Sequence, residues 1–433
     1  MFNPCHTADH FSRRTLLRAT GASGLLWLTP IAEMLAKAEE VAPRGKPAHS
    51  IIVLWMQGGP SQLETFDPHP GTKVAHESLA INTAVKGIQL GTGFEQLADL
   101  MGDVTLVRSI VSKEGDHERA TYNVKTGYRP DPTLIHPSLG AVLCHQQTDN
   151  VEIPRHISIL PGPWPGRGGY LGDSYDAFRV GDPLGPIPDV KARVPKERFE
   201  ERMKHLNMVE DNFTRGRLKN LDQGKTLHRT SINAATRMMS SDQLKAFDVK
   251  EAPQSQRDAY GDSPFGRGCL AALRLIEAGV RCVEVMLDGW DSHANNHETQ
   301  LARIKSLDPA FAQLIRDLKA RNLFDSTIVV CAGEFGRTPQ VNPLGGRDHW
   351  PHGFSAALAG GGFRRGIAYG ETSPELRDDK PNIDRDVKQQ VRVEDLHATI
   401  LSALGLKPSL ELMTPIGRPL KLSDGKVISD LLV

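Results

Sequence analysis

The sequence predicts an α/β protein with a doubly wound, mostly parallel sheet and helices on both of its faces. Short apolar runs rich in β-branched residues recur along the chain, as expected of strands that are covered on both faces. Longer segments with helical periodicity separate these runs, which favours parallel strand–helix–strand connections. The chain has 433 residues, which is long enough to bury a large core.

These patterns predict six strands and five helices. The strands are expected at residues 51–56, 104–110, 156–160, 281–287, 327–332 and 354–360. The helices are expected at residues 93–101, 137–147, 269–279, 298–322 and 393–404. A segment from about 185 to 255 is rich in lysine, arginine, glutamate and glutamine, and its periodicity predicts a helical insertion with a solvated charged face.

The N-terminus carries the pattern of an export signal. The run FSRRTLLR at 11–18 contains a twin arginine, a short apolar stretch follows it, and the small-x-small site Ala36-Lys37-Ala38 ends it. We therefore expect a twin-arginine signal peptide at 1–38, a linker at 39–49 and one α/β domain at 50–433. The apolar stretch is too short and too interrupted for a membrane span of about 20 residues. An N-terminal amphipathic helix is the alternative.

Charge and cysteine content limit the location and the partners. We expect a periplasmic or extracellular protein with the twin-arginine translocase as partner during export and no transmembrane anchor after signal cleavage. Lysine plus arginine equals aspartate plus glutamate, 52 each, so no net field attracts nucleic acid or an anionic membrane. The cysteines of the mature chain have no CxxC spacing and apolar neighbours, which favours buried free thiols over a single disulfide: Cys144, Cys269, Cys282 and Cys331.

Titratable and polar residues follow several of the predicted strands. In open parallel sheets, ligands bind beyond the carboxyl ends of the strands. Four separate segments supply such residues to this edge: Gln57 and Ser61; His117 and Thr121; Asp291, His293 and His297; and Glu334 and Arg337 with Arg347, Asp348, His349 and His352. Taken singly, DSHANNH (291–297) is also typical of a capped helix start, and Glu334 with Arg337 of a buried ion pair. Together the four segments predict a metal or anion site.

The residue types suit a divalent cation of unspecified identity, Zn, Mn, Mg or Ca. The candidate ligands are Asp291, His293, His297, Asp348 and His349. If residues 293–297 begin a helix, His293 and His297 share one face at i, i+4. Two cations about 4 Å apart would clamp a phosphate or sulfate ester. Arg337 or Arg347 would hold the remaining ester oxygens, and a coordinated hydroxyl would be the nucleophile.

The motifs together resemble a known family. IIVLWMQGGPSQLETFDPHPG (51–71), HERATYNVKTG (117–127), GEFGRTP (333–339) and GRDHWPHG (346–353), with the signal, look like the export-targeted family catalogued as domain of unknown function 1501. This family is often labelled sulfatase-like and is placed near the alkaline phosphatase superfamily. The resemblance covers essentially the whole mature chain. It implies an alkaline-phosphatase/sulfatase-like α/β fold and, usually, two metals at the carboxyl edge of the sheet.

Local parallels and departures refine what the resemblance implies. TGYRP (126–130) resembles the end of the sulfatase nucleophile helix, and VEDLHATIL (393–401) resembles a helix near a sulfatase C-terminus. The resemblance makes Asp291, with His293 or His297, and His349 ligands of the first metal site.

The departures concern the nucleophile and the second metal. Gln57-Gly58-Gly59 stands where aspartates are usual, His117 stands at the nucleophile position, and Glu334-Phe335 replaces an Asp-His pair. No C-x-P-x-R motif occurs. These departures argue against a standard sulfatase and against a second metal site.

Two functions follow from the sequence. The first is an exported metal-dependent hydrolase of a sulfate or phosphate ester, acting on an anionic small molecule or polysaccharide. Its expected catalytic residues are Ser61, His117, Thr121, Glu334 and Arg337, and its expected substrate-binding residues are Gln57, Arg347 and His352. The second is a non-catalytic member of the fold that binds an anionic ligand such as a sulfated polysaccharide or serves in an envelope complex. An oxidoreductase is disfavoured, because no CxxCH motif occurs and no GxGxxG follows the first strand.

Overall fold

The computed structural model describes residues 46–147, 151–188, 190–215, 232–377 and 380–433. These residues belong to one compact unit, Gly45–Val433. The predicted signal peptide at 1–38 and most of the predicted linker at 39–49 lie outside the described residues. Within the described part of the chain, no helix is both long enough and apolar enough to cross a membrane.

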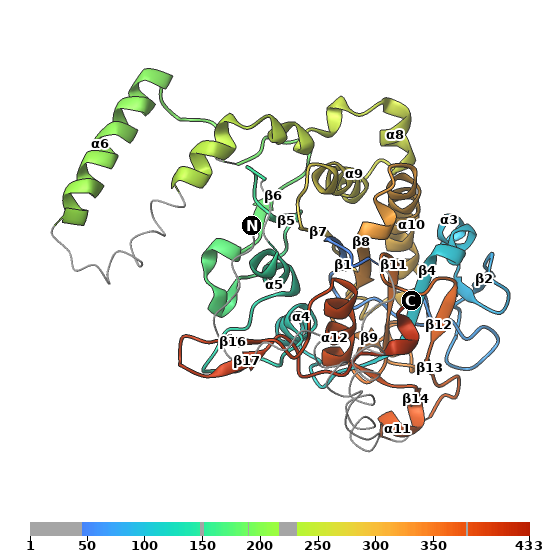
Figure 1. The fold of residues 1–433 in the computed structure, drawn as a ribbon. Helices are drawn as coiled ribbons and strands as arrows, with labels where there is room; N and C mark the ends of the chain where they lie inside the picture. Colours follow the sequence, from blue (N-terminus) through green and yellow to red (C-terminus); the bar gives the residue numbers. More distant parts are fainter. Residues whose placement is uncertain (1–45, 148–150, 189, 216–231, 378–379) are drawn as a thin grey trace, which may run out of the picture. The chain divides into compact units, whose positions relative to one another are not determined.

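A nine-stranded sheet forms the centre of this unit (Figure 1). Its strands are β1 (Ser50–Met56), β4 (Val104–Val111), β5 (His156–Ile159), β6 (Phe178–Val180), β7 (Cys282–Leu287), β8 (Thr327–Ala332), β11 (Phe354–Gly360), β12 (Ile367–Tyr369) and β15 (Val391–Arg392). Their order is β12-β4-β11-β8-β1-β7-β5-β6, with β15 also paired to β4. All pairs are parallel except those of β11, which is antiparallel to β4 and β8. The predicted mostly parallel sheet is confirmed.

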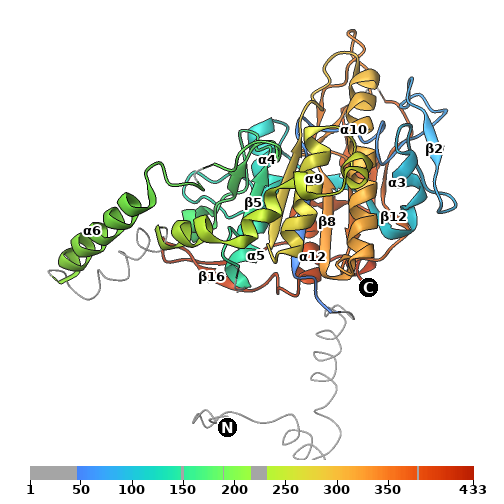
Figure 2. The ribbon, with the colours of Figure 1, turned by 90° about the horizontal axis from the view of Figure 1, so that it is seen from above.

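Helices cover both faces of the sheet, as the sequence predicts. On one face lie α9 (Pro264–Glu277) and α10 (Asn296–Ala320), side by side (Figure 2), and α3 (Glu95–Asp99) contacts α10. On the other face lie α4 (His117–Thr126), α5 (Leu139–Gln146) and α12 (Val393–Ala403). Apolar periodicity does not reveal α4. Its start is fixed by Asp116, whose side chain accepts a hydrogen bond from the backbone N–H of Arg119.

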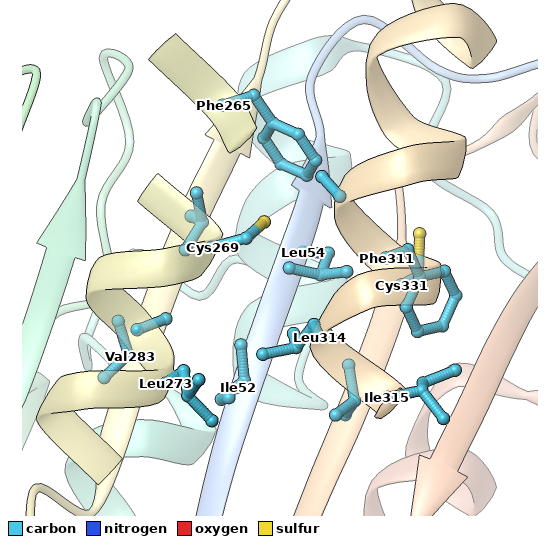
Figure 3. Close-up of a cluster of buried hydrophobic side chains, with 14 of the residues drawn as sticks. Ile52, Leu54, Phe265, Cys269, Leu273, Val283, Phe311, Leu314, Ile315 and Cys331 are labelled. Carbon is cyan, nitrogen blue, oxygen red and sulfur yellow. The ribbon is translucent and has the colours of Figure 1, made fainter. Parts of the chain in front are cut away.

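Alternate residues of each strand face opposite helix layers. In β1, Ile52 and Leu54 belong to the core beneath α9 and α10, whereas Ile51 belongs to the core beneath α5 and α12. Figure 3 shows the first core, where Ile52 and Leu54 face Leu273 of α9 and Leu314 of α10. Side chains alternate with a period of two along a strand, so a strand covered on both faces needs apolar residues at every position.

Shorter elements complete the described chain. The charged segment predicted as an insertion includes α6 (Lys196–Arg215), 3-10 helices at Asp242–Phe247 and Val249–Glu251, and α8 (Gln254–Ala259). Four pairs of short strands lie outside the main sheet: β2 (Ala80–Asn82) with β3 (Gln89–Gly91), β9 (Gly336–Arg337) with β10 (His349–Trp350), β13 (Glu371–Thr372) with β14 (Val387–Lys388), and β16 (Glu411–Met413) with β17 (Pro419–Lys421). The short helix α11 (Ile383–Asp386) precedes β14.

Among the described residues, Cys269, Cys282 and Cys331 are free thiols, and Cys144 is buried as they are. Burial raises the pKa of the Cys269 thiol well above its usual value. A thiol that stays protonated is a poor nucleophile and a poor metal ligand. The predicted free thiols are confirmed at Cys269, Cys282 and Cys331, which are packing residues rather than reactive groups.

Candidate functional site

Loops from separate parts of the chain meet at the carboxyl edge of the sheet. They follow β1, β4, β7 and β8. Residues 347–352 precede β11 rather than follow a strand, and they reach the same edge because β11 runs antiparallel to β4 and β8. In a wholly parallel sheet, a segment that precedes a strand would lie at the opposite edge. The reversal of β11 therefore brings the GRDHWPH segment to the site.

Asp291 and three imidazoles form the centre of the site. Asp291, His117 and His349 each offer one ligand atom, and these atoms lie within 4.8 Å of one another. His293 joins them, with its Nε2 3.2 Å from Asp291 Oδ1 and 3.0 Å from His349 Nε2. The Nε2 atoms of His117 and His349 each lie 3.5 Å from a carboxylate oxygen of Asp291. The structure thus brings together four of the residues that the sequence singled out.

Each of the three imidazoles is held through its Nδ1 atom. The partners are Glu334 Oε1 at 2.7 Å for His117, Asp348 Oδ1 at 2.9 Å for His293, and Gly115 O at 2.8 Å for His349. All three partners accept hydrogen bonds, so each Nδ1 carries the proton and each neutral ring presents the lone pair of Nε2 to the centre. Outer hydrogen bonds of this kind fix the tautomer and the orientation of metal-binding histidines.

The inward-facing nitrogens fit a cation better than they fit each other. His293 Nε2 and His349 Nε2 are 3.0 Å apart, and in the neutral rings each carries a lone pair. Two lone pairs that face each other repel, unless a proton or a cation lies between them. A divalent ion accepts imidazole nitrogens and a carboxylate oxygen at about 2 Å. The residues present therefore fit a metal ion.

A buried arginine anchors Asp291. Arg337 Nη2 donates to Asp291 Oδ1 at 2.6 Å, and the guanidinium also donates to the backbone carbonyls of Gly58, Gly59 and Arg347. Arg337 is 0 % exposed. Burial alone would raise the pKa of Asp291, but the hydrogen bond and charge of Arg337 outweigh burial and lower that pKa. Arg337 therefore keeps Asp291 ionised and does not face a substrate, which corrects its predicted contact with the ester.

Glu334 is a fully buried carboxylate that serves His117. Its Oε1 accepts hydrogen bonds from His117 Nδ1, from Gln57 Nε2 at 3.1 Å and from a backbone N–H of the loop after β1 at 2.8 Å. Trp55 Nε1 donates to Gln57 Oε1 at 2.9 Å, which turns the amide so that its NH₂ group faces Glu334. The hydrogen bond with Glu334 raises the pKa of His117 above its usual value. By contrast, burial lowers the pKa of His349.

Two predicted residues lie away from this centre. Arg347 is 0 % exposed and donates to Glu64 and to three backbone carbonyls, so its guanidinium stabilises the loop rather than binds a substrate. His297 lines a separate cavity of about 200 Å³ together with Glu64. Helix α10 begins at Asn296, so His293 precedes the helix and the predicted shared helical face does not form.

The predicted hydroxyl groups are not presented to a substrate. Ser61 Oγ and Thr121 Oγ1 are buried and have no hydrogen-bond partner among the described residues. A hydroxyl that solvent does not reach is not placed to attack an ester. His352 is half-buried, burial lowers its pKa, and it is not part of the group of ligand atoms.

Two further residues of the prediction contact other side chains of the protein rather than a substrate or a metal. Gln57 contacts Glu334 rather than a substrate, and Asp348 holds His293 through a hydrogen bond. Sequence reasoning missed the carbonyl of Gly115, because a backbone acceptor leaves no trace in residue identity. The geometry thus separates an inner group of donors from the residues that orient them.

Comparisons with known proteins were made for the whole chain. The family model described as Protein of unknown function (DUF1501) matches residues 48–432. No curated protein matches. Among solved structures, the chain is similar to the lipoteichoic acid synthase LtaP from Listeria monocytogenes, with 10% identity, 85% of this chain and 74% of that chain covered, and a TM-score of 0.39.

Two other solved structures are similar at the same level. The alkaline phosphatase from the Antarctic bacterium TAB5 has 12% identity, with 84% of this chain and 99% of that chain covered and a TM-score of 0.38. The C-terminal periplasmic domain of EcEptC from Escherichia coli, in complex with Zn, has 10% identity, with 90% and 95% covered and a TM-score of 0.38. Because these TM-scores are below 0.5, the function has to be argued from this chain's own residues.

Proposed function

Since this chain belongs to the family described as Protein of unknown function (DUF1501), whose description states no activity, we propose a function from the residues of the site. The proposed function is metal-dependent hydrolysis of a sulfate or phosphate ester. One observation carries the proposal. His117, His349 and the ionised Asp291 offer ligand atoms within 4.8 Å of one another, His293 Nε2 lies 3.2 Å from Asp291 Oδ1, and each imidazole is oriented through its Nδ1. This nitrogen-rich donor set suits Zn²⁺ or a similar first-row divalent ion better than Mg²⁺ or Ca²⁺, which prefer oxygen ligands.

The protein's own residues prepare the site for a cation. When bound, the cation supplies Lewis acidity, which polarises an ester and lowers the pKa of water. Arg337 keeps Asp291 ionised, while Glu334 and Asp348 keep two imidazoles in the tautomer that presents Nε2.

Water is the nucleophile that this geometry supports. The hydroxyls of Ser61 and Thr121 are buried, so neither residue is placed to form a covalent ester intermediate with the substrate. Arg337 and Arg347 direct their donors to other protein groups, so the positive charge that attracts the ester comes from the cation. The buried hydroxyls also favour the second candidate function, non-catalytic binding of an anionic ligand, because neither Ser61 nor Thr121 offers a nucleophile to the site.

The substrate class and the location are part of the proposal. We propose an anionic small molecule or polysaccharide as substrate, because the ester is itself anionic. Twin-arginine export to the periplasm or the outside is supported by the FSRRTLLR segment of the sequence.

Metal analysis of the exported protein, purified without chelator, tests the proposal. We expect one divalent ion per chain by mass spectrometry. Asp291→Ala and His349→Ala should lower the occupancy, because each removes a donor atom. His49→Ala is the matched control, because His49 is an exposed histidine outside the site. A folded parent protein without metal would sink the proposal.

Turnover separates the two candidate functions. Aryl sulfate, phosphate monoester and phosphate diester substrates should be assayed with the loaded protein. We expect hydrolysis of at least one ester class and its loss in Asp291→Ala. A metal-loaded protein that turns over no ester but binds sulfated polysaccharide would support the non-catalytic function.

A further inference from the structure

A cavity of about 280 Å³ lies beside α4, on the same helix as His117. Thr121 lines it, and Thr121 follows His117 by four residues, a rise of about 6 Å along the helix. The other walls are the segment 135–138, the loop 163–167 and Arg179 of β6. We infer that this cavity binds the part of the substrate that does not react, and that this part is a sugar ring with an anionic group. Its assignment to a substrate rests on the proposed function.

Flat apolar surfaces form the walls of the cavity. Tyr122 and Trp164 supply aromatic rings, and Pro163 and Pro165 flank Trp164. Tyr122 is fixed in place, because its hydroxyl hydrogen-bonds with His136 Nδ1 at 2.8 Å and accepts from the backbone N–H of His136 at 2.7 Å. Rigid aromatic rings with an apolar face pack well against the C–H face of a sugar ring and cost little conformational entropy on binding.

Cationic side chains around the cavity are available to an anion. Arg179 is exposed, and its guanidinium makes no hydrogen bond or ion pair with the rest of the described chain. The side chain of Arg167 is 60% exposed, and its nearest carboxylate, that of Asp176, is 4.0 Å away. Glu118 is the acidic residue of the lining. The unpaired guanidinium of Arg179 and the largely exposed guanidinium of Arg167 favour a ligand with a sulfate or phosphate group.

A lysine in the wall adds one more donor. Lys125 Nζ donates to Glu284 Oε2 and to Trp164 O, each at 3.0 Å. An ammonium has three N–H donors, two of which these oxygens take, and Nζ also lies 4.9 Å from the centroid of the Trp55 ring. Because Glu284 neutralises the charge of Lys125, this lysine suits a sugar hydroxyl, while the arginines suit the anionic substituent.

The size of the cavity favours one ring. Pockets for drug-sized ligands are about 300–1,000 Å³, and this cavity of about 280 Å³ lies just below that range. A nucleotide, with a base, a ribose and a phosphate, needs more room than a sugar ester. We therefore commit to an anionic saccharide unit rather than a nucleotide.

Calorimetric titration of the full chain with galactose 6-sulfate tests the inference. We expect saturable binding, weaker binding of galactose and of inorganic sulfate, and about tenfold weaker binding of the sugar sulfate to Arg179→Gln, because one charged hydrogen bond is lost. Trp164→Leu should also weaken binding. Arg198→Gln, an exposed arginine on α6, is the matched control and should bind as the parent does.

Three outcomes would overturn the inference: no saturable binding, equal binding by Arg179→Gln and the parent, or tighter binding of adenosine monophosphate than of the sugar ester. The titration is repeated after treatment with a chelator. Binding that persists there does not depend on the cation, so a failure of the metal proposal and a failure of the saccharide site are seen in separate measurements.

Discussion

Acid is expected to destabilise the protein through His397. This residue lies on α12, is 4 % exposed, and donates from Nε2 to Val124 O of α4 at 2.6 Å. Its ring packs on Gly127, the left-handed residue that ends α4, where a Cβ would lie 2.8 Å from His397 Cγ. Burial lowers the pKa of His397 to about 4, and the hydrogen bond to Val124 opposes this effect only in part. The folded state therefore keeps His397 neutral.

The magnitude follows from the pKa in the folded and unfolded states. The unfolded value is 6.5 and the folded value is about 4. Each unit corresponds to about 1.4 kcal/mol, so this difference contributes about 3 kcal/mol to the free energy of unfolding. Because the folded pKa lies below the unfolded pKa, the contribution is complete above pH 6.5 and is lost as the pH falls from 6.5 to about 4.

Urea denaturation near neutral pH and at about pH 4.5 measures this contribution. His397→Gln removes the titrating group, so the parent should lose about 2–3 kcal/mol more than this variant between the two pH values. His49→Gln changes an exposed histidine and should behave like the parent. If the parent and His397→Gln lose the same free energy of unfolding, His397 is not held neutral by burial and the reasoning is refuted.

Three other changes test the site and its supports. Asp348→Ala removes the acceptor that orients a metal-binding imidazole, so calorimetry should show divalent-cation affinity about 10–100-fold lower, with no change for the exposed Asp288→Ala; an unchanged affinity would remove Asp348 from the site. Glu334→Gln removes the carboxylate that raises the pKa of His117, so an NMR titration of protein freed of metal by a chelator should show a lower pKa for His117 than in the parent. An unchanged pKa would contradict the pairing of His117 with Glu334. Asp308→Ala removes a carboxylate that accepts two backbone N–H groups at the start of α3, and thermal denaturation should show a loss of about 1–2 kcal/mol; full stability would mean that α3 needs no cap.

The sheet was readable from the sequence because burial on both faces leaves a local signature. The run IIVLWM of β1 is apolar at nearly every position, and the same holds for TIVVCA of β8. The edge strand β12 has only three residues, all half-buried, and carries no such signature. Helix α4 was also hidden from the pattern, because its buried face includes polar residues such as Thr121 and Asn123.

The donor residues of the site could also be predicted from the sequence, because the strands beside them leave a local signature. Asp291, His293 and His349 follow or precede buried strands, and their residue types are those of metal ligands. The position of His297 could not be read, because the start of α10 depends on Asn295, which adopts a left-handed backbone with φ of 47°. His293 therefore belongs to the site, whereas His297, about one helical turn further along the chain, lines another cavity.

The sequence by itself determined the strand pattern, the family and the kinds of donor atom present at the carboxyl edge. Only the tertiary structure decided which of these atoms meet and what surrounds them. The antiparallel direction of β11 brings His349 to His293, and the buried carbonyls near Arg337 and Arg347 take up their guanidinium donors. The physical reason is that strand direction and the pairing of buried polar groups are set by contacts between residues far apart in the chain, which residue identity and local spacing do not encode.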